Sequence, residues 1–163
     1  MDQYTNVLLL NPSGTKIVLL KRFAGAKFAP NRWTGIGGHI GRGEDVTIAA
    51  LRELFEETGI SQNEVKNFRM VADFIYDSGP YWPRGYRIVY FDGIYTKEKL
   101  PDCSEGVLKW IPIGYLHRYD IIDDTRAVLK ILKQKIFNKE VIKPLKGKFQ
   151  VGEKGVTDQV IIE

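Results

Sequence analysis

Three glutamates stand close together in the segment 45–58, which carries the clearest helical pattern in the sequence. Glu53, Glu56 and Glu57 occupy positions i, i+3 and i+4, so a helix places their side chains on one face. Gly59 is expected to end this helix as its C′ residue. The opposite face is expected to anchor the helix to a sheet through Ile48, Leu51, Leu54 and Phe55.

Like charges at these spacings repel each other, so the acidic face is costly unless something positive offsets it. Oxygen-rich, negatively charged clusters are what hard cations such as Mg²⁺, Mn²⁺ or Ca²⁺ require. Arg52 can pair with a carboxylate and hold its orientation. The glycines before the helix allow the backbone to approach a ligand closely, and they are Gly35, Gly37, Gly38, Gly41 and Gly43. A solvated acidic face is the alternative for the glutamates alone, but the combination favours a divalent-metal site.

The remaining elements alternate between apolar runs and turn residues. The runs 7–10 and 17–20 flank the turn 11–14, which indicates a strand, a turn and a strand. Further strands are expected over 33–40, 68–76, 87–95 and 107–111, with a final hairpin within 147–163. A second amphipathic helix is expected over 125–138. These elements predict one α/β domain over residues 1–163, with a mixed sheet and two main helices.

Composition excludes few functions but guides some expectations. The formal net charge is +4, and lysines gather in the C-terminal third, where a solvated surface explains them without a stable nucleic-acid partner. We expect no signal peptide and no membrane span, because no basic n-region precedes the first apolar run and no run is long enough. The single cysteine, Cys103, is typical of a reducing compartment, so the cytoplasm is expected.

The segment from Gly38 to Ile60 resembles the Nudix box. It fits the pattern G-x5-E-x7-R-E-U-x-E-E-x-G-U at every position, with Glu44 as the first acidic residue and Arg52 opening the final block. This resemblance implies a Nudix α/β/α sandwich with a central mixed β-sheet. It also implies hydrolysis of a nucleoside diphosphate linked to a further group, with Mg²⁺ as the usual cofactor and Mn²⁺ as a substitute.

The resemblance also implies roles for individual residues. Glu53, Glu56 and Glu57 match the metal-binding carboxylates, and the main-chain carbonyl of Gly37 matches an additional ligand. Arg52 matches the arginine that orients the glutamates, and Glu44 matches a supporting position. The general base is expected to be Glu53 or Glu56.

Outside the box, several residues resemble the MutT and mammalian 8-oxo-dGTPase branch of the family. Arg22 is a candidate ligand for a triphosphate. Trp33 and Thr34 fall in a segment similar to W-N-G-x-G-G, where Thr34 offers one hydroxyl in place of the amide that reads the base. Glu105 resembles a downstream acidic metal ligand, with a surface loop glutamate as the alternative.

Two further groups of residues are candidates for binding the base. Asp123 and Asp124 resemble a base-reading pair, and the alternative is that one of them caps the helix that follows. Trp82 is the leading candidate for stacking on a base. The other aromatic candidates, for which core packing is the alternative, are Phe28, Trp33, Tyr81 and Tyr90.

Two classes of function follow. The first is a metal-dependent pyrophosphohydrolase that acts on nucleoside (deoxy)triphosphates, including oxidised ones such as 8-oxo-dGTP, and releases NMP and pyrophosphate. Within this class, ADP-ribose, nucleotide sugars and dinucleotides are the alternative substrates. The second class is a non-catalytic Nudix regulator that binds nucleotides or RNA, but such domains commonly lose box glutamates that this sequence keeps. A monomer and a homodimer are both compatible with the sequence.

Overall fold

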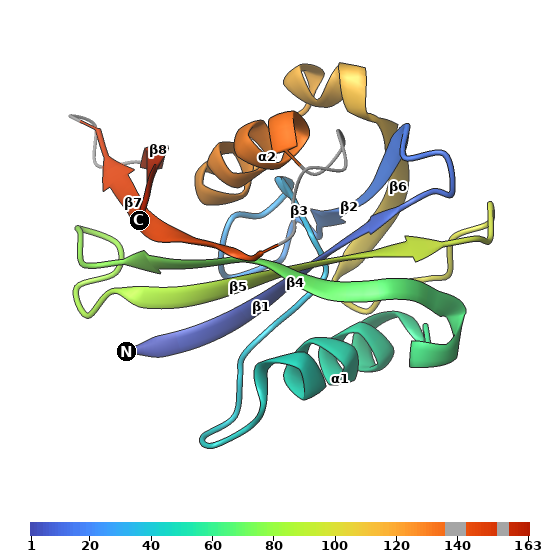
Figure 1. Ribbon diagram of the computed structural model, residues 1–163, viewed down its shortest axis with the longest axis horizontal. Coiled ribbons are helices and arrows are strands. Elements are labelled where there is room, and N and C mark those ends of the chain that lie inside the picture. Colours follow the sequence, from blue (N-terminus) through green and yellow to red (C-terminus); the bar gives the residue numbers. More distant parts are fainter. Residues whose placement is uncertain (136–142, 153–156) are drawn as a thin grey trace.

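A mixed β-sheet with one long helix on each face forms the frame of the protein. The computed structural model describes residues 1–135, 143–152 and 157–163. The helices are α1 (Val46–Thr58) and α2 (Asp123–Lys135), and they lie on opposite sides of the sheet (Figure 1). The strands are β1 (Asp2–Leu10), β2 (Lys16–Arg22), β3 (Trp33–Thr34), β4 (Val65–Tyr76), β5 (Tyr86–Tyr95), β6 (Gly106–Pro112), β7 (Leu145–Val151) and β8 (Thr157–Ile162).

The strand order is β3-β2-β1-β5-β4-β7-β8, and β6 pairs with β2. The pairs β1–β5 and β4–β7 are parallel, and the other pairs are antiparallel. The expected mixed sheet and the α/β/α arrangement are therefore confirmed. The final hairpin is also present as β7 and β8, although residues 153–156 of its turn lie outside the described residues.

Helix α1 ends where its sequence predicts and begins one residue later than expected. Asp45 is the N-cap, and its side chain accepts hydrogen bonds from the backbone N–H groups of Thr47 and Ile48 at 2.9 and 3.1 Å. Gly59 adopts a φ of 74°, and its N–H donates to the carbonyl of Phe55 at 2.8 Å. A left-handed residue at this position favours glycine, because a side chain there is strained.

The predicted anchor face of α1 was partly wrong. Ile48 and Phe55 are 61% and 57% exposed, whereas the buried residues of the helix are Ala49, Ala50, Leu54 and Thr58. The small alanines allow the helix backbone to lie close to the sheet, and Glu53 and Glu57 line a cavity at the edge of this buried face. The helix is thereby rotated about its axis, so that Ile48 and Phe55 face outward.

Strands β1 and β2 separate after one pair, Leu10 and Ile17, and the glycine-containing segment 33–40 enters the gap. The segment is held by its backbone: the carbonyls of Ile36 and Gly38 accept from the N–H groups of Val7 and Thr5 at 2.6 and 2.9 Å. Of the strand expected over 33–40, only Trp33–Thr34 form one, and the rest of the segment makes isolated bridges to Val7 and Tyr4. Segment 33–40, the glycine loop, is thereby held on β1 next to the start of α1.

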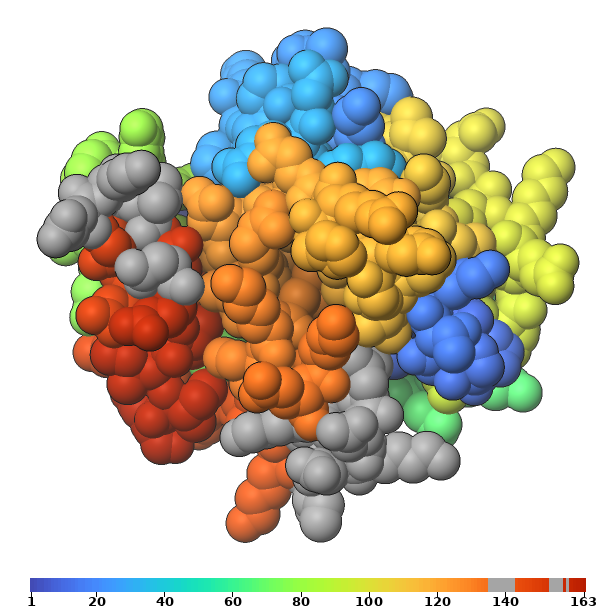
Figure 2. All heavy atoms as spheres, turned by 90° about the horizontal axis from the view of Figure 1, so that it is seen from above, coloured from blue at the N-terminus to red at the C-terminus, as the bar shows by residue number. Residues whose placement is uncertain are grey.

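Alternation along β1 divides the hydrophobic core into two layers. Val7 and Leu9 belong to the layer that contains Leu54 of α1, and Leu8 belongs to the layer that contains Val128 of α2. Seen from the α2 side, α2 (orange) and the short helix Ile113–Arg118 cover the middle of the sheet, beside the red C-terminal strands (Figure 2).

The second predicted helix begins two residues earlier than expected, at Asp123, and is described as far as Lys135. The remainder of the predicted range, 136–138, lies outside the described residues. In the described parts of the chain, no helix is both long enough and apolar enough to cross a membrane.

Candidate active site

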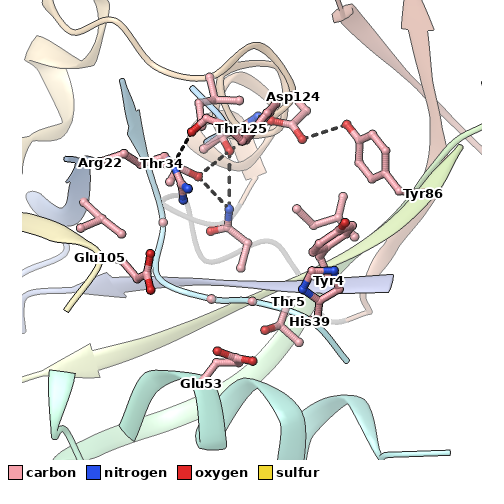
Figure 3. A pocket seen from close by; sticks show the side chains of 18 of the residues that line it. Tyr4, Thr5, Arg22, Thr34, His39, Glu53, Tyr86, Glu105, Asp124 and Thr125 are labelled. Carbon is pink, nitrogen blue, oxygen red and sulfur yellow. Dashed lines mark hydrogen bonds between the residues drawn. The ribbon is translucent and has the colours of Figure 1, made fainter. Parts of the chain in front are cut away.

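A cavity of about 450 Å³ lies where the glycine loop, β1, α1 and the start of α2 meet. Residues far apart in the sequence line it, and Figure 3 shows Glu53 pointing into it from α1, on the side opposite Thr34, Thr125 and Asp124. The predicted site residues in its lining are Arg22, Thr34, Gly37, Glu53, Glu57, Trp82, Glu105 and Asp124. The fold therefore brings most of the predicted metal ligands and substrate contacts to one cavity.

The acidic part of the cavity contains Glu53, Glu57 and Glu105. Burial raises the pKa of Glu57 to about 8, and the charges of Glu53 and Glu105 contribute to this rise. The nearby Arg22 offsets part of the effect. The Oε2 atom of Glu57 is buried and has no hydrogen-bond partner among the described residues. Such a carboxylate, beside two others, is suited to binding a cation.

Arg52 organises the neighbouring carboxylates. Its Nη1 atom donates to Glu53 at 2.8 Å and to Glu56 at 3.2 Å, and its Nη2 atom donates to the carbonyl of His39 at 3.0 Å. Arg52 also binds Glu44, and these hydrogen bonds, together with the N–H of Gly41, lower the pKa of Glu44 to about 2. Arg52 thus fixes Glu53 beside the cavity, as the sequence predicts for an orienting arginine.

Glu56 lies apart from the other predicted metal ligands. Its side chain is 57% exposed, pairs with Arg52, and is not part of the cavity lining. Within residues 1–135, 143–152 and 157–163, no three His, Cys, Asp or Glu side chains are placed so that they could hold a metal ion together. Glu56 instead shares the Nη1 atom of Arg52 with Glu53, at 3.2 and 2.8 Å, on the side of the helix away from the cavity lining.

The two aspartates at the start of α2 have different surroundings. Asp124 lines the cavity, and its carboxylate accepts from the hydroxyl of Tyr86 at 2.9 Å; burial raises the pKa of Asp124. Asp123 instead pairs with Arg32 at 3.2 Å and lines a neighbouring hollow. The N-cap alternative is wrong for both, because the carbonyl of Ile122 accepts the N–H of Arg126 and both aspartates lie within the first turn.

The aromatic candidates lie in different parts of the structure. Phe28 and Trp82 line the cavity, and their ring centroids are 5.6 Å apart. Trp33 is outside the lining and packs against Tyr119 at 5.2 Å. Tyr90 is fully buried, so the core alternative holds for it, and Tyr81 is 76% exposed beside the neighbouring hollow.

Several cavity residues carried no sequence signal as site residues. These are Tyr4, Thr5, Asn6, His39, Tyr86 and Thr125. The ring of His39 packs at a tilt against Tyr4 in the cavity wall, with centroids 4.4 Å apart. No local pattern marks Asn6, because it lies in the strand between the polar Thr5 and the apolar Val7.

Comparison with known proteins relates the sequence to a family. A NUDIX domain family model matches residues 3–132. The oxidized purine nucleoside triphosphate hydrolase of Mus musculus is 43% identical over 58 residues, which is 36% of this chain and 35% of that protein. The chain spans less than half the length of the curated relatives that it matches.

Solved structures share the fold at low sequence identity. A MutT protein from Bacillus halodurans superposes with a TM-score of 0.69 at 18% identity, covering 100% of this chain and 98% of that one. An Ap4A hydrolase from C. elegans gives 0.62 at 17% identity, covering 82% and 96%. The family match covers the box, the glycine loop and most of the cavity, and this chain belongs to the Nudix family.

Proposed function

We propose that this protein is a metal-dependent pyrophosphohydrolase that cleaves nucleoside (deoxy)triphosphates, including oxidised ones such as 8-oxo-dGTP, to NMP and pyrophosphate. The observation that carries the proposal is the composition of a single cavity. Glu53, Glu57 and Glu105 lie in one part of it, and Asp124 and Trp82 lie in another. A nucleotide has the same two parts, because its phosphates need cations and its base needs an aromatic surface and polar contacts.

The residues at the acidic part offer donors of the kind that a divalent cation requires, and a bound cation would have to draw their side chains closer together. Glu53, Glu57 and Glu105 provide hard oxygen donors, the unpartnered Oε2 atom of Glu57 is one of them, and the Gly37 carbonyl and Glu56 are further candidates. Mg²⁺ or Mn²⁺ bound there would offset the phosphate charge and acidify a water molecule. The mouse relative, whose name describes a hydrolase of oxidized purine nucleoside triphosphates, agrees with this class of substrate.

The protein's own groups have separable tasks in this proposal. Arg22 lines the cavity near Glu57, where its positive charge would face the phosphates. Arg52 holds Glu53 in place through a 2.8 Å hydrogen bond. Glu53 fits the role of general base better than Glu56, because its carboxylate lines the cavity whereas Glu56 lies outside it. The base would take the proton of the attacking water onto a carboxylate oxygen.

The test is a product screen with Mg²⁺ over canonical and oxidised (d)NTPs, ADP-ribose, dinucleoside polyphosphates and nucleotide sugars. We expect NMP and pyrophosphate from triphosphates, loss of product with EDTA, and recovery with Mg²⁺ or Mn²⁺. Glu53→Gln and Glu57→Gln should reduce turnover by at least about a hundredfold if these carboxylates act as base and ligand. Retained nucleotide binding without any hydrolysis would instead support the regulatory alternative.

A second hollow favours one alternative substrate class. It has a volume of about 380 Å³ and shares five wall residues with the cavity, which are Phe28, Trp82, Tyr86, Ile122 and Asp124. Tyr81 and Arg32 add an aromatic and a cationic group on its far side. A dinucleotide, which carries a second base, could use this additional surface. Faster turnover of dinucleoside polyphosphates than of any triphosphate in the same screen would establish that alternative.

A further inference from the structure

Asn6 and Thr125 are buried polar side chains in the cavity wall, with exposures of 4% and 1%. Burying polar groups costs free energy unless their hydrogen bonds are made. A chain of hydrogen bonds joins them to Thr34 and Asp124 and offsets part of this cost, while the Oδ1 atom of Asn6 is buried without a partner among the described residues (Figure 3). The role of these hydrogen bonds in recognising a base rests on the proposed function.

The chain of hydrogen bonds joins three structural elements. The Nδ2 atom of Asn6 on β1 donates to the hydroxyl of Thr34 on β3 at 3.2 Å, and to the hydroxyl of Thr125 on α2 at 3.5 Å. The two threonine hydroxyls are 3.2 Å apart. The hydroxyl of Thr125 lies 3.4 Å from Oδ1 of Asp124.

At each end of this chain of hydrogen bonds, the type of atom decides whether it donates or accepts. The amide nitrogen of Asn6 can only donate. The Oδ1 atom of Asp124 already accepts the backbone N–H of Thr125 at 2.6 Å, so it acts as an acceptor toward the Thr125 hydroxyl as well. Each hydroxyl has one proton to donate, and assigning the Thr125 proton to Asp124 leaves the contact between the two hydroxyls to the Thr34 proton. The Thr125 hydroxyl donates to Asp124, and the Thr34 hydroxyl donates to Thr125.

This order determines what Thr34 offers to a ligand. Its only proton is directed to Thr125, and one of its two lone pairs receives the Asn6 amide, so one lone pair remains for the cavity. Tyr86 is similar, because its hydroxyl donates to Asp124 and its oxygen keeps a lone pair. Thr34, Tyr86 and Asp124 therefore present hydrogen-bond acceptors toward a bound base.

We propose that the cavity selects nucleobases that carry an exocyclic amino group, and that Asn6 is the positioning residue that sets this preference by holding the Thr34 hydroxyl as an acceptor. An amino group donates to an acceptor wall. A carbonyl at the same place meets lone pairs and leaves both partners without a hydrogen bond.

Hypoxanthine is the sharpest probe of this preference. It carries no exocyclic amino group, since it has a carbonyl where adenine has its amine and it lacks the amine of guanine. We expect kcat/KM with Mg²⁺ to be at least about tenfold higher for the better of dATP and dGTP than for dITP, which is the effect of one unmade hydrogen bond in a buried site. Equal values for all three nucleotides would overturn the proposal.

Three variants separate positioning from general disruption. Asn6→Leu keeps a similar shape but frees the Thr34 hydroxyl, so the preference over dITP should fall to within about threefold. Thr34→Val should have the same effect, because it removes the acceptor, whereas Thr34→Ser keeps the hydroxyl and should retain the preference. Thr47→Val is the matched control substitution, since Thr47 is exposed on α1 and does not line the cavity. Its preference ratio should not change.

The result also distinguishes this inference from the proposed function. Turnover of triphosphates with no dependence on the amino group would defeat the inference alone. If no nucleotide is hydrolysed, the same ratios are measured as dissociation constants for dATP, dGTP and dITP by calorimetry, and a preference lost in Thr34→Val but kept in Thr34→Ser still supports it. Absence of binding for all three would defeat both. If Asn6→Leu does not fold by circular dichroism, the two Thr34 variants decide the question.

Discussion

The guanidinium of Arg52 binds both carboxylate oxygens of Glu44, with Nε–Oε1 and Nη2–Oε2 distances of 2.8 and 2.9 Å. Glu44 also accepts the N–H of Gly41 at 2.7 Å, so the turn before α1 is tied to the middle of the helix. The remaining nitrogen of Arg52 is thereby aimed at Glu53. A planar, bidentate donor is required for this arrangement, which a lysine does not supply.

Replacing Arg52 by lysine should therefore impair catalysis more than stability. The positive charge remains, but the two parallel hydrogen bonds to Glu44 and the bond that orients Glu53 cannot all be made. We expect kcat to fall by about ten- to a hundredfold, as is typical when a group that orients a ligand is changed. Steady-state kinetics at saturating Mg²⁺ would measure this effect. Arg42→Lys, in the same turn, is the control and should leave kcat within about twofold.

The raised pKa of Glu57 predicts how stability depends on pH without metal. Its pKa is about 8 in the folded protein, whereas an unfolded glutamate titrates near 4.5, so the folded state holds a proton over this window. The contribution of Glu57 to stability is present below about pH 4.5 and is lost as the pH rises through about 8. Glu57→Gln should remove this dependence, which thermal unfolding from pH 5 to 9 in EDTA would reveal. A stability profile identical to that of the wild type would contradict the assignment.

Metal binding should show the opposite pH dependence. A cation on Glu57 must displace its proton, so Mg²⁺ affinity should increase by up to about tenfold per pH unit below pH 8 and level off above it. Calorimetry at pH 7 in two buffers of different ionisation enthalpy should detect close to one proton released per protein. Proton release that persists in Glu57→Gln would assign the proton to another group.

Two adjacent glycines should respond differently to alanine. A Cβ at Gly38 would meet the Glu53 carboxylate at 2.5 Å, whereas a Cβ at Gly37 would meet the backbone carbonyl of Thr5. A side chain can move aside, but a strand backbone held in a sheet cannot. Gly38→Ala should therefore lower kcat with a melting temperature within about 3 °C of the wild type, and Gly37→Ala should lower the melting temperature by about 5 °C or more. Gly25→Ala, which meets nothing within 4 Å, is the control.

Trp82 should contribute to binding of the base and little to the chemical step. It contacts Phe28 and packs against Tyr4 and Tyr86 in the cavity wall. Trp82→Ala should raise KM by about five- to a hundredfold, the range expected for the loss of one stacking platform, with a smaller change in kcat. Tyr81→Ala removes a neighbouring exposed ring and should leave triphosphate KM unchanged. An equal rise in both variants would indicate that the loop, and not stacking, controls KM.

Local signals in the sequence were enough to predict α1, its end at Gly59 and the hairpin strands, because each depends on residues near one another in the chain. Asp45, predicted as the first residue of the helix, is its N-cap. The parallel pairs β1–β5 and β4–β7 were not predictable in this way, since they join segments whose relation depends on the whole fold. The outward position of Ile48 and Phe55 was missed for a related reason. A helical wheel shows which residues share a face, but the sheet beneath decides which face is covered.

The candidate site also contains residues that local sequence signals predict and residues that only the fold brings together. The box spacing predicted Glu53, Glu57 and Arg52, because a helix converts sequence spacing into position. Asn6 and Tyr86 reach the cavity from two strands that are 80 residues apart in the numbering, and no local pattern marks them. Asp123 and Asp124 show the limit most clearly, since both line the neighbouring hollow but only Asp124 also lines the cavity.

Strand β1 contributes neighbouring residues to both parts of the cavity. The N–H of Thr5 holds the carbonyl of Gly38 beside Glu53, and the next side chain along, Asn6, holds Thr34. A base that fits badly against Thr34 and Asn6 would displace β1, and β1 holds the glycine loop in position through its backbone hydrogen bonds. Discrimination between nucleotides should then appear as a lower kcat for a nucleotide with the wrong base. A substitution on β1 that changes the preference for a base should therefore change kcat as well.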